Sequence, residues 1–70
     1  MMAPMFDIFC GRSPEDENVR WLEAVEGFEK ACERMHVLAA AEPGPYFVFC
    51  LADKEVLAFV DTTPKEGPGV

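Results

Sequence analysis

The residues best suited to chemistry are Cys32 and His36, which stand four positions apart in a stretch with helical character. On a helix this spacing makes the two side chains neighbours, which could share a metal ion or act as a thiolate and its base. A metal site would need a third ligand, from Cys10 or Cys50 across the core. Because Cys32 falls within an apolar stripe, we interpret it as an inert buried thiol. We predict no catalytic residue and no cofactor, and an enzyme is the less favoured interpretation.

The remaining reactive groups give weaker signals. The three cysteines are an odd number without metal-binding spacing, which is typical of a reducing compartment and indicates a cytoplasmic protein. Cys10 and Cys50 could face each other on neighbouring strands and oxidise, but a reducing compartment disfavours this bond. The sequence also lacks the glycine motifs that bind phosphate groups.

Size and charge narrow the range of partners. The chain has 70 residues, which make one small domain with a marginal core, and 50% of them are hydrophobic, which favours oligomerisation. Its net charge of −7 repels phosphate backbones and anionic lipid, so we expect neither nucleic acid nor a membrane as partner. A basic protein partner remains open.

The pattern between Pro14 and Ala41 predicts one long amphipathic helix. The segment from Ser13 to Asp16 has the residues of a helix start, and Glu42-Pro43-Gly44-Pro45 stops the helix. The apolar positions are spaced by three and four residues, and they are Trp21, Val25, Phe28, Cys32, Met35 and Ala39. Such a helix would be about 42 Å long and would overhang strands of about 20 Å.

Three short segments read as strands. Met5 to Cys10 is the first, and Tyr46 to Leu51 and Val56 to Asp61 form a hairpin. The sequence therefore predicts an α+β fold of order β-α-β-β, with a three-stranded, mainly antiparallel sheet and the helix packed on one face. We favour the last strand at the centre, while a parallel crossover between the first two strands stays open. The predicted domain covers residues 5–63, between a variable start at 1–4 and a flexible tail at 64–70.

The hairpin is apolar on both faces, although one helix can cover only one of them. In the expected register Phe47 pairs with Val60, and this more apolar face, which also holds Phe49, is assigned to the helix. The opposite face is left as a predicted interface, made of Tyr46, Val48, Cys50, Leu57 and Phe59, with Phe9 beside them. An apolar face of this kind indicates association, so we expect a homodimer of uncharacterised role. The alternatives are an acidic adaptor or inhibitor on a basic protein, and a metal- or thiol-dependent site at Cys32 and His36.

Overall fold

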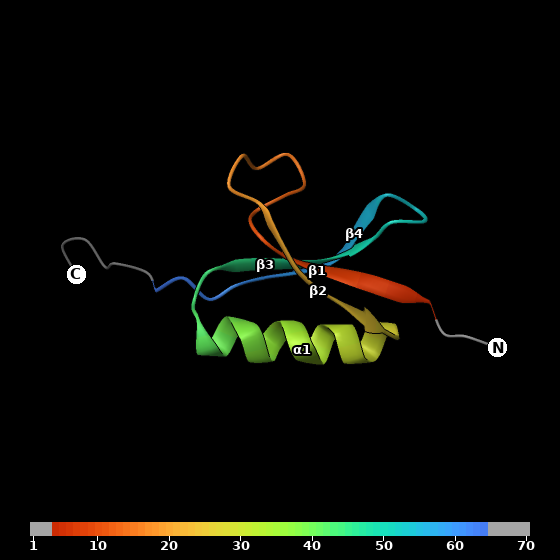
Figure 1. Ribbon diagram of the computed structural model, residues 1–70. Helices are drawn as coiled ribbons and strands as arrows, with labels where there is room; N and C mark the ends of the chain where they lie inside the picture. The colour runs from red at the N-terminus through yellow and green to blue at the C-terminus, as the bar shows by residue number, and fades with distance from the viewer. Residues whose placement is uncertain (1–3, 65–70) are drawn as a thin grey trace.

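The computed structural model describes residues 4–64 and shows an antiparallel sheet with one helix across one face (Figure 1). In chain order the elements are β1 (Met5–Cys10), β2 (Arg20–Glu26), α1 (Phe28–Ala41), β3 (Pro45–Cys50) and β4 (Glu55–Asp61). The four strands lie in the order β2-β1-β3-β4, and every neighbouring pair is antiparallel. The predicted α+β class is confirmed, but the sheet has four strands where the sequence predicts three.

The additional strand, β2, comes from the first half of the predicted helix. Its connection to β1 is a loop of successive turns, in which the amide of Asp16 donates to the carbonyl of Ser13 at 3.1 Å and that of Val19 donates to Asp16 at 3.0 Å. The Asp16 carboxylate accepts from the amides of Arg12 and Asn18, each at 2.9 Å. The residues that resemble a helix start therefore organise a β1–β2 loop instead.

A β-bulge explains why β2 has the spacing of a helix. Ile8 pairs with Glu23 and Phe9 pairs with Trp21, so Leu22 is an extra residue in β2. The bulge interrupts the two-residue alternation of a strand, because the residues on either side of it no longer alternate strictly between the two faces. Leu22 and Val25 consequently share the helix-facing side of the sheet at a spacing of three, which is also a helical spacing.

Helix α1 is half the predicted length and matches the sheet. Its 14 residues span about 21 Å, close to the length of a six-residue strand. The helix begins after Gly27, where a φ of 91° turns the chain out of β2. At its C-terminal end two side-chain hydroxyls donate hydrogen bonds to backbone carbonyls. The Tyr46 hydroxyl donates to the Glu42 carbonyl at 2.5 Å, and the Thr62 hydroxyl donates to the Ala39 carbonyl at 2.7 Å.

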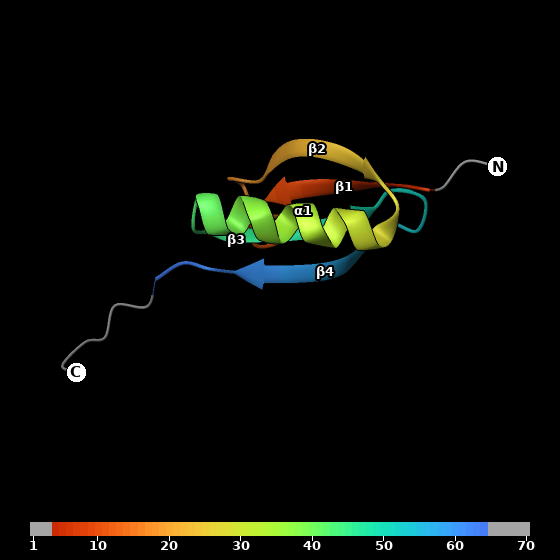
Figure 2. The same cartoon turned by 90° about the horizontal axis from the view of Figure 1, so that it is seen from below.

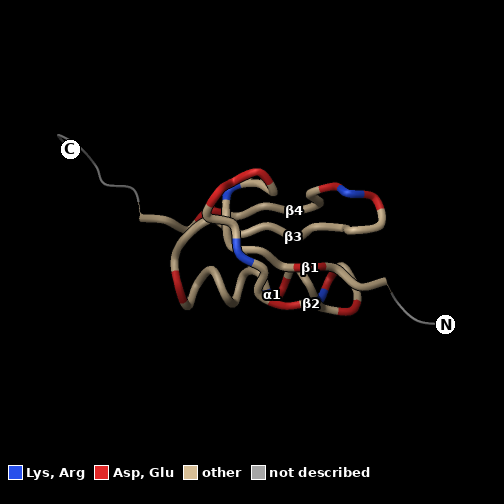
Figure 3. Tube along the Cα trace, turned by 45° about the horizontal axis from the view of Figure 1, so that its top comes forward, with Lys and Arg blue, Asp and Glu red and all other residues tan. Residues whose placement is uncertain are grey.

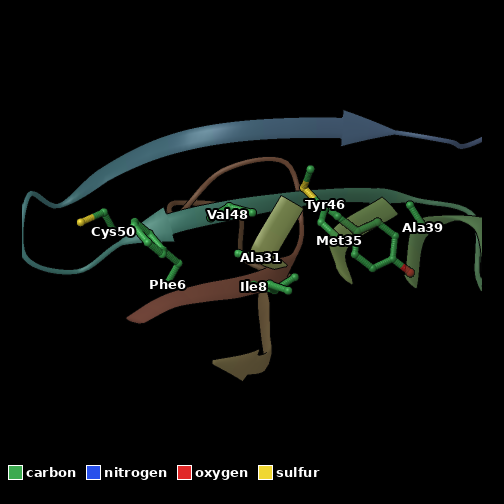
Figure 4. Packing of buried hydrophobic residues seen from close by; sticks show 8 residues of the cluster. All are labelled: Phe6, Ile8, Ala31, Met35, Ala39, Tyr46, Val48 and Cys50. Atoms are coloured by element: carbon green, nitrogen blue, oxygen red, sulfur yellow. The ribbon is translucent and has the colours of Figure 1, made fainter. Parts of the chain in front are cut away.

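The core lies between α1 and the inner strands β1 and β3 (Figures 2 and 4). The helix contributes a narrow stripe of Ala31, Met35 and Ala39, in which the two alanines let the helix approach the sheet closely while Met35 fills the space between them. At the start of the helix, Phe28 meets Phe6 edge to face at 5.6 Å between ring centroids. The buried strand residues on this side are Phe6, Ile8, Tyr46, Val48 and Cys50.

The predicted assignment of faces on the hairpin is wrong. Leu57 is an extra residue in β4, so the register shifts between Val48 and Phe49. Together with the pairing of Cys50 with Glu55 at the turn, this shift pairs Val60 with Tyr46 instead of Phe47, and Val60 packs against the core on the helix side. A change of one residue in register moves side chains to the opposite face of a sheet. On β3 the helix therefore covers Tyr46, Val48 and Cys50, whereas Phe47 and Phe49 face away from it.

The strand order also differs from the favoured prediction. The last strand, β4, lies at an edge, and the centre of the sheet is the antiparallel pair of β1 and β3. The parallel crossover is wrong as well, although it places the first strand beside Pro45–Cys50, as the structure does. The predicted variable start and flexible tail lie outside the described residues, except for Pro4 and Pro64. The carbonyl of Pro4 accepts a hydrogen bond from Gly27 at 2.9 Å.

Candidate functional site

An aromatic side chain from each strand lies on the sheet face that α1 leaves open. Phe9 pairs with Trp21 on one side and with Phe47 on the other, and Phe47 pairs with Phe59. Cross-strand partners share a face, so these residues form a row that crosses the whole sheet in the order β2, β1, β3, β4. We call this set, Trp21, Phe9, Phe47 and Phe59, the aromatic row.

The middle of the aromatic row is closely packed and its ends are exposed. The rings of Phe9 and Phe47 stack at 5.2 Å, and Phe49 meets each of them edge to face at 6.0 and 6.5 Å. Phe47 retains only 1% of its surface, while Trp21 and Phe59 keep 58% and 50%. The two outer rings therefore present large apolar surfaces to solvent.

Asp7 is the charged residue of β1 within this face. It pairs with Phe49 on β3, and its carboxylate accepts a hydrogen bond from the Trp21 indole at 3.2 Å. The bond holds the Trp21 ring at its place beside the row and satisfies one of the carboxylate oxygens. A partner on this face would meet aromatic rings together with a carboxylate that already has one donor.

The other charges near the open face gather at the ends of the strands. Figure 3 shows them in the β1–β2 loop and in the turn between β3 and β4, whereas the middle of β3 and β4 is uncharged. In the β1–β2 loop, the Nη1 atom of Arg12 lies 3.7 Å from the Oδ2 atom of Asp61 at the end of β4. Both connections rise on the side away from α1, so they border the open face at opposite ends (Figure 1).

Both edge strands carry a bulge, whereas the inner pair is regular. The extra residues are Leu22 in β2 and Leu57 in β4, and the pairing of β1 with β3 has no shift. Bulges on edge strands disturb the row of free amides and carbonyls that another strand would need. The edges are therefore poor sites for strand addition, and the open face is the better candidate for an interaction surface.

The structure separates the six residues of the predicted interface into two groups. Tyr46, Val48 and Cys50 are buried against α1, so they belong to the core and not to a surface. Phe9 and Phe59 lie in the aromatic row, and Leu57 lies next to it at the bulge of β4, where it is exposed.

The prediction omitted Trp21, Phe47 and Phe49 from the open face. The spacing of apolar residues places Trp21 in the predicted helix, and the predicted hairpin places the two phenylalanines on the face beneath that helix. The bulge at Leu22 places two apolar residues next to each other, so β2 lacks the two-residue alternation that would indicate a strand.

Cys32 and His36 do not come together with further ligands. Cys32 is partly buried, and desolvation raises the pKa of its thiol, which disfavours the thiolate needed for nucleophilic or metal chemistry. His36 is exposed on the outer side of α1. Within residues 4–64, no group of three or more His, Cys, Asp or Glu residues could hold a metal ion.

The thiols of Cys10 and Cys50 lie at opposite ends of the central strand pair. Cys10 is opposite Tyr46 at the start of β3, whereas Cys50 ends that strand and pairs with Glu55. The alternative of a bond between them is therefore excluded by the register. All three cysteines, Cys10, Cys32 and Cys50, are free thiols.

Comparisons with known proteins give no relative for this arrangement. The chain matches no protein-family model, no curated protein and no solved structure at a significant level. Among residues 4–64, no helix has the length and apolar character needed to cross a membrane.

Proposed function

We propose that the protein is a self-associating domain, in which the open faces of two copies pack against each other. The observation that carries this proposal is the aromatic row, with its buried centre and its two exposed ends at Trp21 and Phe59. Exposed aromatic rings around a packed centre have the character of the core of a protein interface. A domain of this size also gains stability that its own small core does not provide.

The dimensions of the face support a weak dimer. Four strands about 4.8 Å apart and six residues long have a footprint of roughly 19 by 20 Å, or about 400 Å². A standard interface buries about 800 Å² of accessible surface on each partner. The remaining buried area would have to come from side chains that project above the flat footprint and from the two bordering loops. We therefore expect a dissociation constant in the micromolar range.

The bordering loops favour one relative orientation of the copies. Because they rise at opposite ends of the strands, an aligned second sheet would meet both of them (Figure 1). A sheet rotated by about 90° would place its own loops beside the open flanks formed by β2 and β4. This corresponds to the orthogonal packing found between sheets in some folded proteins.

Charge and cysteine chemistry support two further parts of the proposal. The net charge of −7 makes nucleic acid an unfavourable occupant of the aromatic face. The free thiols of Cys10, Cys32 and Cys50 fit a reducing compartment such as the cytoplasm.

The substitution Phe59→Asp tests the proposal directly. It places a charge at the exposed end of the aromatic row, where the proposed interface would have to desolvate it. Light scattering between about 1 and 500 µM should give a concentration-dependent mass for the wild type and a monomer mass for the variant. A wild type that stays monomeric over this range contradicts the proposal.

Val37→Asp is the matched control. Val37 is 54% exposed and lies on α1, on the other side of the molecule. This substitution adds the same charge but should leave self-association unchanged. Equal dissociation of both variants would show that net charge, and not the open face, controls the oligomeric state.

A further inference from the structure

A pocket of about 320 Å³ lies on the helix side of the sheet, away from the open face. Its apolar wall comes from Leu22 on β2, Leu38 and Ala41 near the end of α1, and Cys10 with Tyr46 on the inner strands. In Figure 1, β2 descends from its loop towards the start of the helix, so its Arg20 end is the end farther from α1. The pocket forms there, between the diverging strand and the last turns of the helix.

Two of the polar side chains that line the pocket, those of Glu23 and Tyr46, have defined partners. The Glu23 carboxylate receives two hydrogen bonds from the Arg34 guanidinium, at 2.8 and 3.0 Å, so its charge is already matched. The same bonds lower the pKa of Glu23 and keep it ionised. The hydroxyl of Tyr46 is engaged with the Glu42 carbonyl at 2.5 Å, which fixes the backbone where the helix ends.

Arg20 and Glu42 supply opposite charges to the pocket. Arg20 is the cross-strand partner of Cys10 and makes no ion pair within 4.0 Å among the described residues. Glu42 follows the last residue of α1, so its carboxylate adds to the negative end of the helix dipole. Both act on Tyr46: burial raises the pKa of its hydroxyl most, Cys10 and then Glu42 raise it further, and Arg20 opposes the shift.

This arrangement selects among small ligands by charge. A simple anion would meet Arg20, but it would be repelled by Glu42 and by the net charge of −7. A simple cation would be attracted by Glu42 but repelled by the positive charge of Arg20. A zwitterion pairs one charge with each residue and carries no net charge against the field of the protein.

We propose that this pocket binds a small apolar α-amino acid. The guanidinium of Arg20 receives the carboxylate, and the Glu42 carboxylate with the helix end receives the ammonium group. The aliphatic side chain of the ligand packs on Leu22 and Leu38. The pocket volume lies at the lower end of the range for small-molecule sites, which fits a ligand of this size.

Titration of the full chain with L-leucine, followed by the methyl NMR signals of Leu22 and Leu38, tests this proposal. We expect saturable shifts, and affinity at least about tenfold lower for 4-methylpentanoate, which lacks the ammonium group, and for isoamylamine, which lacks the carboxylate. Absence of saturable shifts up to about 20 mM L-leucine would overturn the proposal. Equal binding of either analogue would overturn the two-charge recognition on which it depends.

Variants separate the two charges and leave the core untouched. Arg20→Gln and Glu42→Gln change exposed residues, and each should weaken L-leucine binding about tenfold or more. Arg12→Gln is the control, because Arg12 lies near Asp61 and does not line the pocket. Unchanged affinity in Arg20→Gln contradicts the assignment of the carboxylate site. Since the pocket and the aromatic row are on opposite faces, failure here leaves the proposed dimer unaffected.

Discussion

Asp16 shows how one side chain organises a connection between strands. Its carboxylate accepts the amides of Arg12 and Asn18, and its carbonyl accepts the amide of Val19. These bonds replace the packing that the exposed β1–β2 loop lacks. The two amide donors also lower the pKa of Asp16 below its ordinary value of 3.8, because they stabilise the charged form.

The lowered pKa of Asp16 makes a prediction about pH. A group with a depressed pKa in the folded state adds stability above its ordinary pKa, and this contribution is lost as pH falls through the folded value. We expect wild type to be more stable than Asp16→Asn at neutral pH, and the difference to shrink below pH 3.8. Urea denaturation of both proteins between about pH 2 and 7 measures this difference.

Glu15→Gln is the control for Asp16, because Glu15 is an exposed carboxylate in the same loop. Its effect on stability should be small at every pH. A difference between Asp16→Asn and wild type that does not vary with pH would show that the carboxylate charge is not involved.

The hairpin of β1 and β2 depends on a close approach between its strand ends. Gly11 is buried with a φ of 150°, and its amide donates to the Pro45 carbonyl at 2.9 Å. A Cβ atom at this position would lie 3.0 Å from the Cα and the Cγ2 of Val19. Because Val19 lies just before β2, a side chain here would push the two strands apart.

Gly11→Ala is therefore expected to be more destabilising than Gly27→Ala. Both positions have positive φ, but a Cβ on Gly27 would have no atom within 4 Å. We expect a loss of about 2 kcal/mol or more at Gly11, from strain and overlap together, and about 1 kcal/mol at Gly27, from strain alone. Urea denaturation compares the two variants, and equal losses would show that the contact with Val19 relaxes without cost.

Local patterns predicted most elements, and β2 shows where they fail. Alternation and the Gly and Pro breaks located β1, β3, β4 and the end of α1 to within one residue. A bulge gives Leu22 and Val25 a helical spacing, and Ser13 with Pro14 resembles a helix start. Only pairing with β1, which is a tertiary contact, selects the strand.

The open face was predictable as a feature but not in its residues. The hairpin of β3 and β4 is apolar on both faces, and the sequence predicts one helix to cover them. This correctly indicates that one face stays uncovered. The sequence assigns the Phe47 and Phe49 side to the helix because that side is the more apolar, and the extra residue Leu57 then moves Val60 to the other side. Apolar content is a poor guide to this choice, because α1 packs on the side of β3 that holds Tyr46 and Val48, and the side with Phe47 and Phe49 stays open.

At the scale of the whole molecule, net charge opposes the proposed dimer. Each copy carries a charge of −7, so two copies repel each other, and the repulsion is screened over about 10 Å at 0.1 M salt. An acidic adaptor on a basic protein has the opposite dependence, because salt weakens attraction between unlike charges.

We therefore expect added salt to strengthen self-association. Raising sodium chloride from about 20 to 500 mM should lower the dissociation constant several-fold in sedimentation equilibrium. Sodium sulfate at equal ionic strength controls for the separate effect of salt on apolar burial. Weaker association at high salt would indicate that ion pairs, rather than the aromatic row, hold the copies together.

The central pairing of β1 with β3 also has a consequence for how the chain reaches its fold. Each outer pairing closes over a short connection, whereas β1 and β3 are separated by residues 11–44. Closing this long loop costs entropy before the core of Ile8 and Val48 forms, so we expect two hairpins to form early and their docking to set the folding rate. If docking sets the folding rate, Ile8→Val should slow folding and change the unfolding rate little, which stopped-flow kinetics would measure.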